Sequence, residues 1–236
     1  MTSLLGSFGG MDQNSPPQVN HRPIIFVHGV TLSAAFFHGH RKYLMEKGYS
    51  NSELYATTYG KGLLTPLYVD TFKCSYVKMI RQFIIAVSSY TNSKVDIIAY
   101  SMGVGVTRKA ILGGNCVDTG EYVGSPLTLL VENYVGVAGA TYGLEFCPPI
   151  FIGCNLLNGL NCMSTYLREV NSQYEKFEGS NTYVIYSKDD QIVGQRCCGR
   201  QCSIFPCADK IFQIPLCEHL SAPLCSIGLQ YSLVAS

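Results

Sequence analysis

Ser101 lies where a short apolar strand is expected to end and a helix to begin. Residues 95–100 are rich in β-branched side chains, and residues 102–112 are compatible with a helix. At such a sharp turn a serine hydroxyl stands clear of the sheet, and the next backbone N–H points to where an oxyanion would form. The usual motif is G-x-S-x-G, and here Ala99 replaces the first glycine. The pattern predicts a nucleophile for acyl transfer.

A base and an acid follow later expected strands, in the order Ser101, Asp190, His219. A serine hydroxyl is a weak nucleophile until a base takes its proton, and an imidazole can accept that proton and return it. A carboxylate holds the imidazole in the required tautomer and stabilises its protonated form. Asp189 adjoins Asp190, so the residues alone leave two candidates for the acid.

The segment before residue 31 supplies a second predicted oxyanion donor. Residues 24–27 form a continuous apolar run, as expected for a strand that is buried on both faces of a parallel sheet. Gly29 permits a sharp turn that leaves the N–H of Val30 free to face a ligand. We expect the N–H groups of Val30 and Met102 to form the oxyanion hole. The His28 side chain is predicted to be packed at the strand end.

Strands and helices alternate along the rest of the chain. This alternation predicts an α/β fold with a mostly parallel central sheet and helices on both faces, where reactive groups gather beyond the carboxyl ends of strands. We expect the solvent side of one helix to carry Lys73, Lys78 and Arg81. We also expect His38 and His40 to be solvated or capping groups. The expected strands are 24–27, 53–59, 95–100, 134–139, 182–186 and 210–216. The expected helices are 31–47, one within 68–90, 102–112, 164–177 and 223–234.

Residues 1–22 are predicted to be an irregular lead-in, and residues 23–236 a single domain. Apolar residues make up 47% of the chain and charged residues 14%, which is enough for a substantial core. A cysteine-rich insertion near 144–165 and a cysteine-rich loop near 195–208 interrupt the alternation. The insertion is either a stapled surface loop or a partial lid that forms an acyl-chain wall.

The 11 cysteines indicate a disulfide set in a secreted protein, with one cysteine free or paired elsewhere. The alternative is a zinc site on Cys197, Cys198, Cys202 and Cys207, although this spacing lacks paired C-x-x-C knuckles. The N-terminus as written does not have the pattern of a signal peptide.

Charge and hydropathy exclude other classes of partner. The net charge is +1 and no Lys/Arg run exists, which argues against nucleic acid and anionic membranes. No stretch reaches the roughly 18 apolar residues that a transmembrane helix needs.

The Ser…acid…His order is that of α/β-hydrolases, and four segments resemble the class 2 lipases in particular. This family is close to the minimal bacterial lipase A type and is abundant in nematodes as secreted, cysteine-rich proteins. In that minimal group an Ala-x-Ser-x-Gly motif is typical and the acid precedes x-Ile-Val, which selects Asp190. The insertion and the cysteine cluster depart from the minimal form. The matching segments are residues 23–30, 95–103, 184–193 and 218–220.

The resemblance implies an acylglycerol lipase that acts without metal or cofactor, with Ser101, Asp190 and His219 as the triad. Val30, Met102 and Leu220 would rim the site, with no cation placed to hold a charged acyl group. The expected partners are a lipid or other ester and, transiently, a lipid interface. The alternatives are a short-chain carboxylesterase or acyltransferase on the same scaffold, and a catalytically inactive secreted binding module.

Overall fold

Six parallel strands form the central sheet of the computed structural model, which describes residues 6–10, 19–62 and 68–235. The order across the sheet is β2-β1-β3-β4-β5-β8, so the sheet grows outward in both directions from β1 and β3. The strands are β1 (Ile24–Val27), β2 (Leu54–Ala56), β3 (Val95–Tyr100), β4 (Val131–Val137), β5 (Asn181–Ser187) and β8 (Lys210–Ile214). The predicted α/β class with a mostly parallel central sheet is confirmed.

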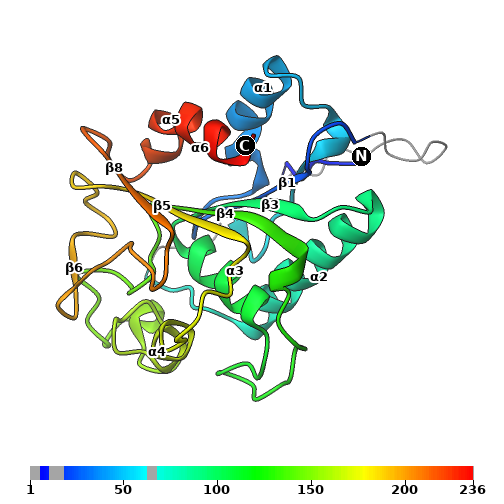
Figure 1. The fold of residues 1–236 in the computed structure, drawn as a ribbon. Coiled ribbons are helices and arrows are strands. Elements are labelled where there is room, and N and C mark those ends of the chain that lie inside the picture. The colour runs from blue at the N-terminus through cyan, green and yellow to red at the C-terminus, as the bar shows by residue number, and fades with distance from the viewer. Residues whose placement is uncertain (1–5, 11–18, 63–67, 236) are drawn as a thin grey trace.

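Helices cover both faces of the sheet (Figure 1). The α2, α3 and α4 helices pack on one face, and α1, α5 and α6 pack on the other. Side chains alternate along β3 accordingly: Ile97 and Ala99 face the first group, while Ile98 and Tyr100 face the second. The helices are α1 (His38–Glu46), α2 (Cys74–Thr91), α3 (Met102–Leu112), α4 (Thr165–Asn171), α5 (Ala222–Cys225) and α6 (Ile227–Val234).

Several element boundaries differ from the predicted ones. The first helix begins as a short 3-10 helix over Ala34–Phe37, and the last is split at Ser226. The helix predicted over 164–177 ends at Asn171, and the helix expected within residues 68–90 runs from Cys74 to Thr91. The last strand stops before Pro215 and lies at the sheet edge.

Two side chains that were expected on the surface are buried. The Arg81 guanidinium donates to the carbonyl oxygens of Ala110 and Ser125, so it joins α2 to the end of α3 and the following loop. His40 lies under α5, with its Nε2 atom 3.2 Å from the Pro223 carbonyl oxygen. Hydrophobic periodicity did not detect these contacts, because each links segments that are distant in sequence.

Five disulfides connect ten of the 11 cysteines. The zinc alternative is wrong, because three of its four cysteines are already paired and only Cys207 is free. The loop after β5 forms a small hairpin of β6 (Arg196–Cys197) and β7 (Arg200–Gln201). None of the helices in the described part of the chain has the length and hydrophobicity to cross a bilayer. The disulfides are Cys74–Cys116, Cys147–Cys154, Cys162–Cys198, Cys197–Cys202 and Cys217–Cys225.

Gly103 lets the first turn of α3 approach the end of β1. A Cβ atom at this position would lie 2.4 Å from the carbonyl oxygen of His28 and 2.8 Å from that of Val27. We therefore expect Gly103→Ala to lower the free energy of unfolding by about 2 kcal/mol or more, because backbone atoms cannot give way as a side chain can. Urea denaturation of the disulfide-intact protein measures this loss.

Gly39→Ala is the matched control, since a Cβ there meets nothing closer than 3.5 Å and Gly39 also lies in a helix. Its unfolding free energy should be unchanged or higher by less than about 1 kcal/mol. Equal effects of the two substitutions would contradict the proposed close packing at Gly103.

Candidate active site

Ser101 occupies a strained turn between β3 and α3. Its φ of 55° and ψ of −126° are unusual for a residue with a side chain. Neighbouring strands hold the turn: the Ser101 N–H donates to the carbonyl oxygen of Val137 at 3.0 Å, and the N–H of Ala140 donates to that of Ser101 at 3.2 Å. A Cβ at Gly29 would lie 2.8 Å from the Ser101 Cβ, so glycine is required beside the turn.

The structure brings the three predicted side chains together in one hydrogen-bonded series. Ser101 Oγ lies 2.9 Å from His219 Nε2, and His219 Nδ1 lies 2.7 Å from Asp190 Oδ2. All three side chains are buried. Because an ionised carboxylate only accepts hydrogen bonds, the ring proton lies on Nδ1 and the Nε2 lone pair accepts from the serine hydroxyl.

The acid and the base are fixed by their own loops. The second carboxylate oxygen of Asp190, Oδ1, accepts from the N–H groups of Ile192 and Val193 at 3.0 and 2.8 Å. The His219 N–H donates to Gln191 Oε1 at 3.1 Å. The Cys217–Cys225 disulfide closes the loop that contains His219. Contacts to the His219 backbone, as well as the hydrogen bond to its ring, therefore position the imidazole.

Asp189 faces a different partner. Its Oδ2 atom accepts the N–H of Leu216 at 2.9 Å, just beyond the end of β8. This bond helps to hold Leu216 at a φ of 54°. Of the two neighbouring carboxylates, only Asp190 reaches the imidazole.

The two expected oxyanion donors follow β1 and β3, which are neighbours in the sheet. Val30 lies in the turn after β1, and Met102 is the first residue of α3. Within the described residues, neither of these N–H groups donates a hydrogen bond to the protein. The first N–H groups of a helix normally lack an internal partner, so the Met102 N–H can face a ligand, and the N–H of Val30 is free to do so because its turn leaves it unbonded.

The His28 ring orients one of these donors. His28 Nδ1 donates to the Gly29 carbonyl oxygen at 2.7 Å, and Nε2 accepts the N–H of Tyr59 at 3.1 Å. Burial lowers the His28 pKa to about 4, so the ring is neutral and keeps both bonds. Because the C=O of Gly29 and the N–H of Val30 belong to one planar peptide, fixing the first fixes the second.

This role of His28 was not predicted from the sequence. The prediction placed the His28 side chain in packing alone, and the structure adds the bond to the Gly29–Val30 peptide. Tyr59 completes the arrangement, since its ring stacks on His28 at 4.3 Å and its hydroxyl donates to the His28 carbonyl oxygen. It lies 31 residues from His28, so no local pattern pointed to it.

The insertion near 144–165 joins the site through the acid loop. The Glu145 N–H donates to the carbonyl oxygen of Val193 at 2.9 Å, and Glu145 Oε2 accepts the N–H of Gln195 at 2.6 Å. The Cys147–Cys154 disulfide staples the segment, whose regular structure is one short 3-10 helix over Ile152–Cys154.

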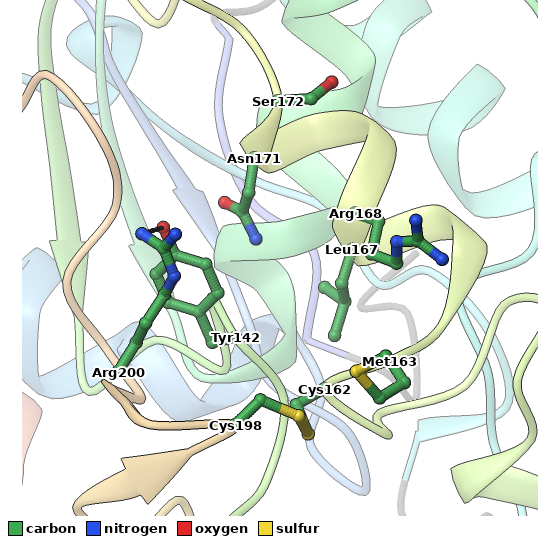
Figure 2. Close-up of a pocket in the computed structure, with 9 residues that line it drawn as sticks. All are labelled: Tyr142, Cys162, Met163, Leu167, Arg168, Asn171, Ser172, Cys198 and Arg200. Carbon is green, nitrogen blue, oxygen red and sulfur yellow. Dashed lines mark hydrogen bonds between the residues drawn. A yellow bond between two sulfur atoms is a disulfide. The ribbon is translucent and has the colours of Figure 1, made fainter.

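A separate cavity of about 330 Å³ lies between α4 and the β6–β7 hairpin (Figure 2). Its floor is the Cys162–Cys198 disulfide, with Leu167 and Met163 on one side and the Arg200 and Tyr142 side chains on the other. None of the triad residues lines it, and no serine–histidine pair does. This cavity is therefore distinct from the hydrogen-bonded series at the strand ends.

Comparisons with known proteins give a family for this chain and solved structures with a similar fold. The family described as lipase (class 2) matches residues 21–223. A mature lipase of Bacillus licheniformis, BlEst2, has a similar fold with a TM-score of 0.65 at 12% identity, covering 94% of this chain and 97% of that one. Lipase B of Aspergillus fumigatus gives 0.62 at 14% identity, over 93% of this chain but 54% of its own length. A monoacylglycerol lipase of Paleococcus ferrophilus gives 0.55 at 10% identity, covering 92% of this chain and 97% of that one.

The two neighbouring aspartates give a test of the site. We expect Asp190→Asn to lower turnover of a soluble ester by about 10³-fold or more, because an amide cannot stabilise the protonated imidazole or hold the same tautomer. Steady-state hydrolysis of p-nitrophenyl butyrate measures this effect.

Asp189→Asn is the control, and should change turnover by less than about threefold, as for most surface substitutions. The opposite ranking of the two variants would show that the acid has been assigned to the wrong residue.

Proposed function

Because this chain belongs to the class 2 lipase family, we propose that it cleaves carboxylic esters of lipids, acylglycerols in particular, through an acyl-enzyme on Ser101. The observation that carries the proposal is the buried series Ser101–His219–Asp190, with bonds of 2.9 and 2.7 Å. A nucleophile, a base and an orienting acid at these distances have the geometry of acyl transfer.

In the proposed mechanism Ser101 Oγ attacks the ester carbonyl while its proton passes to His219 Nε2. The new imidazolium is stabilised by Asp190, and the N–H groups of Val30 and Met102 donate to the oxyanion. Collapse of the tetrahedral intermediate breaks the ester C–O bond, and His219 returns the proton to the departing alcohol. Water then attacks the acyl-enzyme with His219 as base, which releases the fatty acid and restores Ser101.

The charges near the site support a neutral substrate. Between residues 144 and 167 the only charged residue is Glu145, and between 215 and 225 it is Glu218. No cation in either segment could hold a carboxylate or phosphate. An uncharged acylglycerol fits these two segments, which offer an anionic ester no cation.

Two sets of exposed apolar side chains support transient contact with a lipid surface. The leucine stripe, Leu216, Leu220 and Leu224, flanks His219, and Leu216 is 89% exposed in a strained backbone conformation. The second set, the insertion patch, consists of Phe146, Ile150, Ile152, Leu156, Leu157 and Met163. It lies on the insertion near 144–165, which is hydrogen-bonded to the loop that follows Asp190. Large exposed apolar patches of this kind mark interaction sites.

We further propose that the protein acts outside the cell, since five disulfides persist in oxidising surroundings. The same cysteine content is the basis for placing it with the secreted nematode members of the family. The alternatives are a short-chain carboxylesterase or acyltransferase and an inactive binding module, and they differ from the lipase in measurable activity.

Chain-length preference separates these functions. The wild-type protein should hydrolyse emulsified triolein as well as soluble butyrate esters, and Ser101→Ala should retain neither activity, because the hydroxyl that forms the acyl-enzyme is absent. Hydrolysis of butyrate esters alone would indicate a short-chain esterase. A folded protein with no activity on either substrate would favour the binding module.

Lipid contact is tested by Ile150→Ser combined with Leu216→Ser. Removing two exposed apolar side chains should weaken adsorption to neutral phosphatidylcholine-coated triolein droplets by about tenfold or more, because each buried side chain contributes roughly 1.5–3 kcal/mol. Co-flotation of protein with droplets measures adsorption. Turnover of soluble p-nitrophenyl butyrate should not change.

The control is Leu129→Ser, because Leu129 is 84% exposed but precedes β4, at the other end of the sheet from Ser101. Equal adsorption of both variants and the wild type would refute the proposed contact surface.

A further inference from the structure

Tyr100 connects the nucleophile turn to the base. It is the last residue of β3 and directly precedes Ser101, and its side chain is 1% exposed. Its hydroxyl donates to the backbone carbonyl oxygen of His219 at 3.0 Å, across 119 residues of sequence. The second position of the Ala-x-Ser-x-Gly motif, directly before the serine, therefore carries a contact that the motif itself does not specify.

The Tyr100 ring has little freedom to move. It stacks on Phe36 with ring centroids 5.3 Å apart, and it lies 5.1 Å from the His219 ring. Burial, with a smaller effect from the charge of Asp190, raises the Tyr100 pKa far above its ordinary value, so the hydroxyl keeps its proton and remains a donor.

The His219 backbone has few other bonds. Its N–H donates to Gln191, an exposed side chain, and from the rest of the described chain its carbonyl oxygen accepts only the more distant N–H of Ala222 at 3.3 Å. Ala222 also donates to Glu218, at 2.9 Å, so its bond to His219 is the weaker of the two. Among the described residues, the Tyr100 hydroxyl is thus the buried side-chain group that hydrogen-bonds to the His219 backbone.

We propose that Tyr100 is a positioning residue, which holds the His219 backbone so that the imidazole stays aligned with Ser101. This inference rests on the proposed function, since it concerns the same site. Alignment within a fraction of an ångström governs proton transfer between the serine and the histidine. The Tyr100 side chain thereby links the end of β3 to the loop after β8, and these two strands are not neighbours in the sheet.

The test is Tyr100→Phe, which removes one oxygen atom and keeps the ring packing. We expect kcat for p-nitrophenyl butyrate to fall about five- to tenfold, the effect of one net hydrogen bond, with KM unchanged. A second readout does not need turnover: the low-field proton NMR signal of His219 Nδ1–H, bonded to Asp190, should broaden or shift upfield in the variant.

Tyr55→Phe is the matched control. Tyr55 lies on β2, and its buried hydroxyl also donates to a backbone carbonyl oxygen, that of Ser52, at 2.6 Å. It should lose similar stability in urea denaturation and keep the wild-type kcat and NMR signal. If Tyr100→Phe matches Tyr55→Phe in both readouts, the hydroxyl has only a structural role and the proposal is overturned.

The two proposals fail in different ways. A wild-type protein without esterase activity would refute the proposed function, and the NMR comparison would then decide the role of Tyr100 alone. An active wild type with kcat and NMR signal unaffected by Tyr100→Phe would refute only the positioning role.

Discussion

The strained backbone of Ser101 is the constraint on which the rest of the site depends. A non-glycine residue in this region costs roughly 1–3 kcal/mol and persists only where its surroundings over-determine it. Hydrogen bonds to β4 and to the segment after it fix the turn, and Gly29 and Gly103 allow the neighbouring backbone to approach. Because the sheet holds the strain, the hydroxyl stands at the strand end with α3 beginning at the next residue.

The groups around this turn come from separate segments that the parallel sheet brings to one end. The proposed oxyanion donors follow β1 and β3, Asp190 follows β5, and His219 follows the edge strand β8. An edge strand is bonded on one side only, so the His219 loop needs additional support. The Cys217–Cys225 disulfide, Gln191 and the Tyr100 hydroxyl are in position to provide it. A disulfide in this position fits the proposed location outside the cell, because a reducing compartment would not maintain it.

Much of this could be predicted from the sequence, because short apolar runs and small residues at turns leave local patterns. The strands, the α/β class and the proximity of Ser101, Asp190 and His219 follow from order and spacing. The buried Arg81 and His40, the His28–Tyr59 pair and the disulfide connectivity do not. Each depends on contacts between distant segments, and a polar side chain looks alike in sequence whether it meets water or a buried carbonyl oxygen.

The most direct test of the account is covalent labelling by a fluorophosphonate, followed by peptide mapping of the intact, disulfide-bonded protein. A hydroxyl activated by His219 should react with one equivalent of reagent, and the label should map to Ser101 and be absent from Ser101→Ala. Failure of the folded wild type to label, or a label on another residue, would contradict the claim that this turn presents an activated nucleophile.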